Sequence, residues 1–89
     1  MFENTYLNLN ERSKEILKQL VDYYLKTGEP IGSETLASKM GLKISSSSIR
    51  SIMSELQKEG LLYSPHHSSG RIPTDRGMRL FVDGLLEIG

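Results

Sequence analysis

The chain has 89 residues, a length that favours one small domain, and it lacks cysteine, which excludes disulfides and thiolate metal sites. Eleven basic and eleven acidic residues give a formal net charge of zero. No apolar run approaches the roughly 18 to 20 residues of a membrane span, and the N-terminus lacks a signal-peptide pattern. We therefore expect a soluble, cytoplasmic protein without membrane contact.

The neutral total conceals an uneven distribution of charge. Residues 1–42 carry five basic and six acidic side chains, whereas residues 43–79 carry six basic and three acidic ones. Attraction to a polyanion depends on the local field, so a neutral domain with such a basic block is compatible with nucleic-acid binding.

The first predicted helix covers residues 11–27. Apolar side chains repeat at spacings of three and four after Asn10, a favourable N-cap residue, and Gly28 follows as a stop. The predicted buried stripe consists of Ile16, Leu17, Leu20, Val21, Tyr24 and Leu25.

A short second helix is predicted after the helix-breaking segment 29–32. Ser33 is its expected N-cap, because the hydroxyl can accept from an early helical amide, and Gly41 ends the helix. Its apolar side consists of Leu36, Ala37 and Met40.

A third helix is predicted over residues 46–59, with Ser45 or Ser46 as N-cap. Its apolar positions are Ile49, Ile52, Met53 and Leu56. At about 100° per residue, a polar stripe falls on the opposite side. That stripe consists of Ser47, Ser51, Ser54 and Lys58, with Arg50 beside it.

Residues 61–63 and 71–73 are predicted to pair as a short hairpin across the Ser/Gly-rich segment 64–70. Gly70 is expected to supply the positive φ of the turn. Pro73 restricts the second strand to an edge or to the strand's end.

A last helix is predicted to begin at Thr74 and Asp75. Gly77 and Gly84 lower its intrinsic stability, so it should depend on packing against the rest of the domain. Its predicted apolar stripe consists of Met78, Phe81, Val82, Leu85 and Leu86.

This order of elements predicts a mainly α fold with a small β-hairpin, a winged helix-turn-helix. We expect it to cover residues 10–87, after an N-terminal extension of residues 1–9. The third helix would enter the major groove of double-stranded DNA, or it would be an ordinary solvated helix. The candidate base-reading or phosphate-binding residues on it are Ser46, Ser47, Arg50, Ser51, Ser54 and Lys58.

The hairpin supplies a second set of candidate DNA contacts. Arg71 is the strongest, because a guanidinium beside small residues can enter a minor groove or bind a phosphate, although pairing with Asp75 or Glu59 is the alternative. The two histidines could bind a phosphate or be exposed loop residues. The complete wing set is His66, His67, Ser68, Ser69, Gly70 and Arg71. Further candidates for contact with the DNA backbone are Ser33, Thr35, Lys43, Arg76 and Arg79.

Catalytic, metal and cofactor sites are not expected. Adjacent histidines in an extended segment face opposite sides, and no third ligand completes a metal site. The segment 68–70 lacks the signature of a nucleotide-binding loop. The Ser, His and Asp residues have no cleft-forming scaffold around them, so we predict no enzyme activity.

Two motifs, "TGEPIGS" at 27–33 and "SGRIPTDRG" at 69–77, are the most specific features that the sequence shares with a known protein family. Over roughly residues 10–87 it resembles the N-terminal winged-helix domain of the heat-inducible transcription repressors of the HrcA family. The resemblance implies a negative regulator of class I heat-shock operons, which binds as a homodimer to an inverted-repeat operator (CIRCE) ahead of chaperone genes. A GroEL-type chaperonin is the family's modulator, and family members are much longer than this chain.

The sequence departs from the family's pattern at the start of the third helix. Serines 46, 47, 48 and 51 stand where the family has Pro, Ala, Thr and Asn. Ser51 cannot form the bidentate contact that asparagine makes with adenine. The alternative function is a winged helix for protein–protein interaction, docking a partner through the serine stripe or the apolar side of the last helix.

Overall fold

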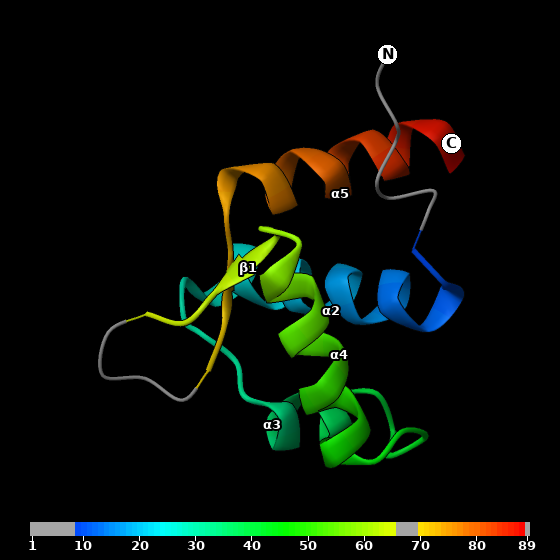
Figure 1. The fold of residues 1–89 in the computed structure, drawn as a ribbon, viewed down its shortest axis with the longest axis vertical. Helices are drawn as coiled ribbons and strands as arrows, with labels where there is room; N and C mark the ends of the chain where they lie inside the picture. Colours follow the sequence, from blue (N-terminus) through cyan, green and yellow to red (C-terminus); the bar gives the residue numbers. More distant parts are fainter. Residues whose placement is uncertain (1–8, 66–69, 89) are drawn as a thin grey trace.

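The computed structural model describes residues 9–65 and 70–88, with side chains described up to Gly84. Figure 1 shows α4 at the centre, with α3 below it and α5 above. The elements in chain order are α2 (Glu11–Thr27), α3 (Ser33–Lys39), α4 (Ser46–Lys58), β1 (Leu62–Tyr63), β2 (Ile72–Pro73) and α5 (Asp75–Ile88). The predicted mainly α fold with one hairpin is confirmed. None of the described helices combines the length and apolarity needed to cross a membrane.

Helix α2 has the predicted bounds and both predicted caps. The side chain of Asn10 accepts from the amide of Ser13 at 2.7 Å, and Gly28 closes the helix in the left-handed conformation at φ 72°. The prediction that Leu25 is buried is wrong, since it is 58% exposed. At about 100° per residue Leu25 lies about 180° from Ile16, beyond the arc that the core covers.

Helix α3 begins differently from the prediction. Gly32, in an extended conformation, occupies the N-cap position without a side-chain bond, and Ser33 is the first helical residue and buried. The predicted Ser33 cap is therefore wrong. The physical reason is that Ile31, paired with Arg71, holds the chain extended up to Gly32.

The turn between α3 and α4 uses two consecutive left-handed residues. Gly41 has φ 75° and Leu42 has φ 60°. The amide of Gly41 donates to the carbonyl of Ser38 at 3.1 Å, and that of Leu42 donates to Ala37 at 2.8 Å. These two bonds satisfy the last carbonyls of α3 in a Schellman motif, which directs the chain toward α4.

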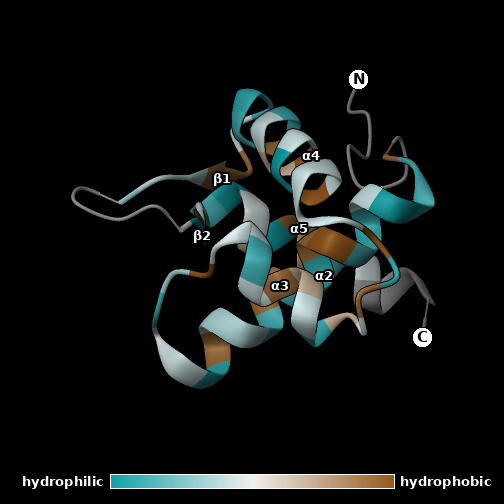
Figure 2. Cartoon of the chain, turned by 90° about the horizontal axis from the view of Figure 1, so that it is seen from below, coloured by the Kyte–Doolittle hydropathy of each residue, from teal (hydrophilic) through white to brown (hydrophobic). Residues whose placement is uncertain are grey.

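Helix α4 starts where the serine run predicted. Ser45 is the N-cap, and its hydroxyl accepts from the amide of Ser48 at 3.1 Å. Ile49, Met53 and Leu56 are buried as expected. Figure 2 shows hydrophobic segments on α2, α3 and α4, and all three helices contribute buried residues to one core, so α4 leaves its polar side outward.

The hairpin is antiparallel, with Leu62 opposite Pro73 and Tyr63 opposite Ile72. A third segment joins it, because Ile31 exchanges both backbone hydrogen bonds with Arg71, at 3.1 and 2.9 Å. The predicted positive φ of Gly70 is wrong, since only Gly28, Gly41 and Gly60 among the described glycines have one. A Cβ at Gly70 would lie 2.9 Å from the amide nitrogen of Ile31, so glycine is needed there for close approach.

Thr74 connects the end of α4 to the start of α5. Its hydroxyl donates to the carbonyl of Gly60 at 2.7 Å and accepts from the amide of Gly77 at 3.1 Å. The predicted start of the last helix at Thr74 and Asp75 is confirmed, with Thr74 as the residue that caps it.

Helix α5 packs through a face that contains glycines. A Cβ at Gly77 would lie 2.1 Å from the carbonyl oxygen of Leu61, so only glycine allows this approach. Gly77, Leu80 and Gly84 are buried, whereas Val82 is 50% exposed and its predicted burial is wrong. Met78 and Phe81 of the predicted stripe are half-buried against the core, and the close contact with Leu61, just before β1, adds small residues to this face; Leu85 and Leu86 lie outside the described side chains.

Candidate nucleic-acid interface

Helices α3 and α4 and the turn between them form a helix-turn-helix, with α3 packed against α4. The outward side of α4 is polar, as the sequence predicted. The exposed candidates on it are Ser47, Arg50, Ser51, Ser54 and Lys58, and Ser46 is half-buried in the first turn. The small serines leave the backbone of α4 open to close approach by a large, flat or grooved partner.

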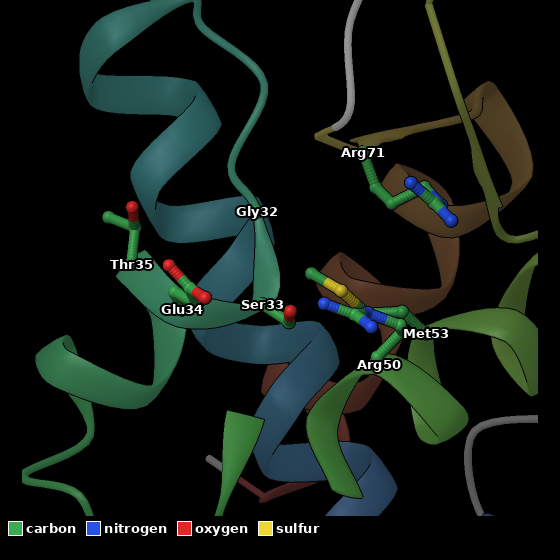
Figure 3. Close-up of a pocket in the computed structure, with 7 residues that line it drawn as sticks. All are labelled: Gly32, Ser33, Glu34, Thr35, Arg50, Met53 and Arg71. Atoms are coloured by element: carbon green, nitrogen blue, oxygen red, sulfur yellow. The ribbon is translucent and has the colours of Figure 1, made fainter. Parts of the chain in front are cut away.

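A pocket of about 480 Å³ lies beside this polar side. One wall is the first turn of α3, and the other is formed by α4 and the residue that precedes β2. Figure 3 shows Arg50, Met53 and Arg71 on one side, and Ser33, Glu34 and Thr35 on the other. The helix-turn-helix and the hairpin therefore present their polar residues to one shared hollow.

Arg50 supplies positive charge to this pocket. Its side chain is exposed, and among the described residues it has no hydrogen bond or ion pair. Glu34 on the opposite wall is also exposed. A ligand that enters between them meets a guanidinium on the α4 side and a carboxylate at the edge of α3.

Arg71 is held in place by both its backbone and its side chain. The backbone exchanges two hydrogen bonds with Ile31. In the side chain, Nε donates to Oε1 of Gln57 at 2.8 Å, and Nη1 donates to the carbonyl of Gly70 at 3.4 Å. The wing arginine is thus attached to the last turn of α4.

Gln57 is the residue that sequence reasoning missed. It lies seven positions after Arg50 and, at about 100° per residue, faces nearly the same direction. That spacing could have indicated that Gln57 shares a face with Arg50. The residue was not selected because glutamine carries no charge and this one belongs to no recognised motif.

The other predicted contacts fall into separate groups. Thr35 and Lys43 are exposed near the start and end of α3, whereas Ser33 is buried in the pocket wall. Arg76 and Arg79 are exposed on α5, which Figure 1 places at the opposite end of the long axis from α3. The structure does not bring these two arginines to the pocket.

The predicted wing residues fall into two groups. His66, His67, Ser68 and Ser69 lie outside the described residues, whereas Gly70 and Arg71 lie on the loop side of β2, directly before it. Within residues 9–65 and 70–88, no three His, Cys, Asp or Glu side chains are grouped as a metal site would require.

Comparison with known proteins gives a consistent family. A family model described as "Winged helix-turn-helix transcription repressor, HrcA DNA-binding" matches residues 8–81. The "Heat-inducible transcription repressor HrcA" of Gluconobacter oxydans (strain 621H) is 53% identical over 79 residues, which are 89% of this chain and 22% of that protein. The protein of the same name from Bradyrhizobium sp. (strain ORS 278) is 48% identical over 81 residues, or 91% of this chain and 22% of that protein.

A solved structure, described as "Crystal structure of a hypothetical protein at 2.2 A resolution", has the same fold. Its TM-score is 0.84 at 36% identity, and the match covers 91% of this chain and 25% of that chain. The chain therefore spans about a quarter or less of the length of the proteins that it matches.

Proposed function

The chain belongs to the HrcA family of winged helix-turn-helix transcription repressors, and from that premise we propose that it is the sequence-specific DNA-binding module of a heat-inducible repressor. The observation that carries the proposal is the exposed polar side of α4 beside a pocket that two arginines share. We assign residues 10–87 to this module and residues 1–9 to an extension. The family is one of transcription repressors, which is not an enzyme class.

In this proposal α4 lies in the major groove. Ser47, Ser51 and Ser54 allow the helix backbone to approach the bases, and their hydroxyls bond base edges or phosphates. Arg50 reaches a base edge or a phosphate from the pocket side, and Lys58 adds charge at the rim. Exposure of all five side chains supports this placement, because none must be uncovered before DNA binds.

The hairpin contacts DNA beside the major-groove site. Arg71 binds a phosphate or enters the minor groove. Arg50 and Arg71 line the same pocket, which supports contact of both with one continuous stretch of the DNA backbone. Thr35 and Lys43 bind the backbone on the α3 side. Contact by His66, His67, Ser68 and Ser69 stays a prediction from the sequence.

The finer proposal concerns the whole repressor. Two copies bind an inverted-repeat operator, CIRCE, ahead of chaperone genes in the cytoplasm, and a GroEL-type chaperonin modulates the repressor. Family membership supports this proposal. The chain spans 22% of the length of each of these two relatives, so dimerisation and modulation belong to the proposal for the whole repressor.

Fluorescence anisotropy tests specific binding directly. A labelled duplex that carries the CIRCE repeat is titrated with the protein at several salt concentrations, beside a scrambled duplex of equal composition. We expect tighter binding to the repeat and a linear fall of log affinity with log salt concentration. Equal affinity for both duplexes at every salt concentration contradicts sequence-specific recognition.

The second candidate function is a winged helix that docks another protein. Exposed apolar side chains favour it, namely Leu25 at the end of α2 and Val82 on α5, which are 58% and 50% exposed. A protein complex that is insensitive to salt, without any DNA binding at low salt, would favour this alternative.

A further inference from the structure

We propose that Gln57 is a positioning residue for DNA binding, which acts by fixing the guanidinium of Arg71 beside the pocket shared with Arg50. The inference rests on the proposed function and adds to it a residue that need not touch DNA. Its basis is the hydrogen bond of 2.8 Å from Nε of Arg71 to Oε1 of Gln57.

The bond connects two elements that the sequence separates. Gln57 belongs to the last full turn of α4, and Arg71 immediately precedes β2, fourteen residues later. A major-groove helix and a wing must meet the DNA in one fixed relative position. This side-chain bond links the two elements through Arg71, which lines the pocket, and Gln57, which does not.

The backbone of Arg71 is already fixed without Gln57. Its amide and carbonyl both pair with Ile31, at 2.9 and 3.1 Å. The long side chain has more conformations to lose, and ordering it upon binding costs entropy. Its Nη1 donates to the carbonyl of Gly70 at 3.4 Å, a longer contact than the 2.8 Å bond from Nε to Gln57. Gln57 orders that side chain before DNA arrives, so the cost is not added at binding.

The chemistry of Gln57 suits this role. Its amide oxygen accepts a hydrogen bond but carries no charge, so this bond does not neutralise the guanidinium of Arg71. The bond lies at an exposed position, where a hydrogen bond contributes little net stability. Buried Leu61 and Leu62 already hold the hairpin against the core. Loss of the Gln57 bond should therefore affect binding more than folding.

The test is a double-mutant cycle on the anisotropy assay with the CIRCE duplex. Gln57→Met removes the acceptor but keeps a side chain of similar length, and we expect it to weaken binding on the order of threefold to tenfold. In an Arg71→Ala background the same change should have no further effect, because the positioned group is absent. Gln57→Glu keeps an acceptor oxygen but places a negative charge beside Arg71 and the DNA, so we expect it to bind no more tightly than Gln57→Met.

Gln19→Met is the matched control. Gln19 is a glutamine of α2 that also makes a side-chain hydrogen bond, from its Nε2 to Glu15 at 2.8 Å, outside the pocket. We expect this variant to bind DNA as the wild type does, and thermal melts of all variants to agree closely.

The outcomes separate this inference from the proposed function. If the wild type binds the operator specifically but Gln57→Met binds equally well, the positioning role is overturned and the proposed function stands. It is also overturned by an equal loss in the Arg71→Ala background, or by unfolding of Gln57→Met. If the wild type does not bind DNA, both the proposed function and the positioning role of Gln57 are overturned.

Discussion

The Nε atom of Arg71 donates a 2.8 Å hydrogen bond to Oε1 of Gln57, and this bond joins the wing to the last turn of α4. Arg50 lies on the same side of α4 and lines the same pocket as Arg71. The candidate interface is therefore assembled from positions 50, 57 and 71, which no single motif contains.

Replacement of Arg50 should weaken operator binding. Arg50→Ala removes a guanidinium without a partner among the described residues, so folding should be unaffected while binding loses about 1 to 3 kcal/mol if the side chain reads a base. Anisotropy against CIRCE and scrambled duplexes measures the loss. Arg12→Ala, at an exposed position on α2, is the control, and an equal effect of both variants would contradict a specific role for Arg50.

Gly77→Ala should destabilise the fold. The added methyl would lie 2.1 Å from the carbonyl oxygen of Leu61, so α5 must move away from Leu61, at a cost of about 3 kcal/mol. Chemical denaturation monitored by circular dichroism measures the change. Gly32→Ala is the control, because a Cβ at that position would meet no atom within 4 Å, and the loss of an N-cap glycine should cost only about 1 kcal/mol or less. A similar loss in both variants would show that the close approach is not the cause.

Thr74→Val should also lower stability, without steric strain. The substitution keeps the shape of the side chain but removes the hydroxyl that bonds both Gly60 and Gly77, and the expected loss is about 1 to 2 kcal/mol. Thr74→Ser retains the hydroxyl and should restore most of the stability. Equal denaturation midpoints for the Val and Ser variants would rule out the capping role.

Leu42→Asn should stabilise the protein. Leu42 is 75% exposed and has φ 60°, a conformation that asparagine adopts more readily than leucine. We expect a gain of about 0.5 to 1 kcal/mol. Gly41→Ala, at φ 75°, should have the opposite effect. A lower thermal midpoint for Leu42→Asn would mean that this leucine makes a contribution that outweighs its backbone strain.

Sequence patterns predicted the ends of helices well where the capping contact joins residues close together in the sequence. Asn10 and Gly28 set the bounds of α2, and Ser45 caps α4, because each cap bonds a residue three or four positions away. Ser33 failed as a cap for the opposite reason. The start of α3 depends on the pairing of Ile31 with Arg71, forty residues later.

The sequence by itself determined the helices, the order of elements and the polar side of α4, since these follow from periodicity and capping within a few residues. It also indicated the family through two motifs. Only the tertiary structure decided that Gly70 and Gly77 are sites of close backbone approach, and that Gln57 holds Arg71. The physical reason is that these relationships are set by where separate elements come to rest against one core. Hydrophobic burial fixes that arrangement for the whole chain at once, and no local pattern of residues encodes it.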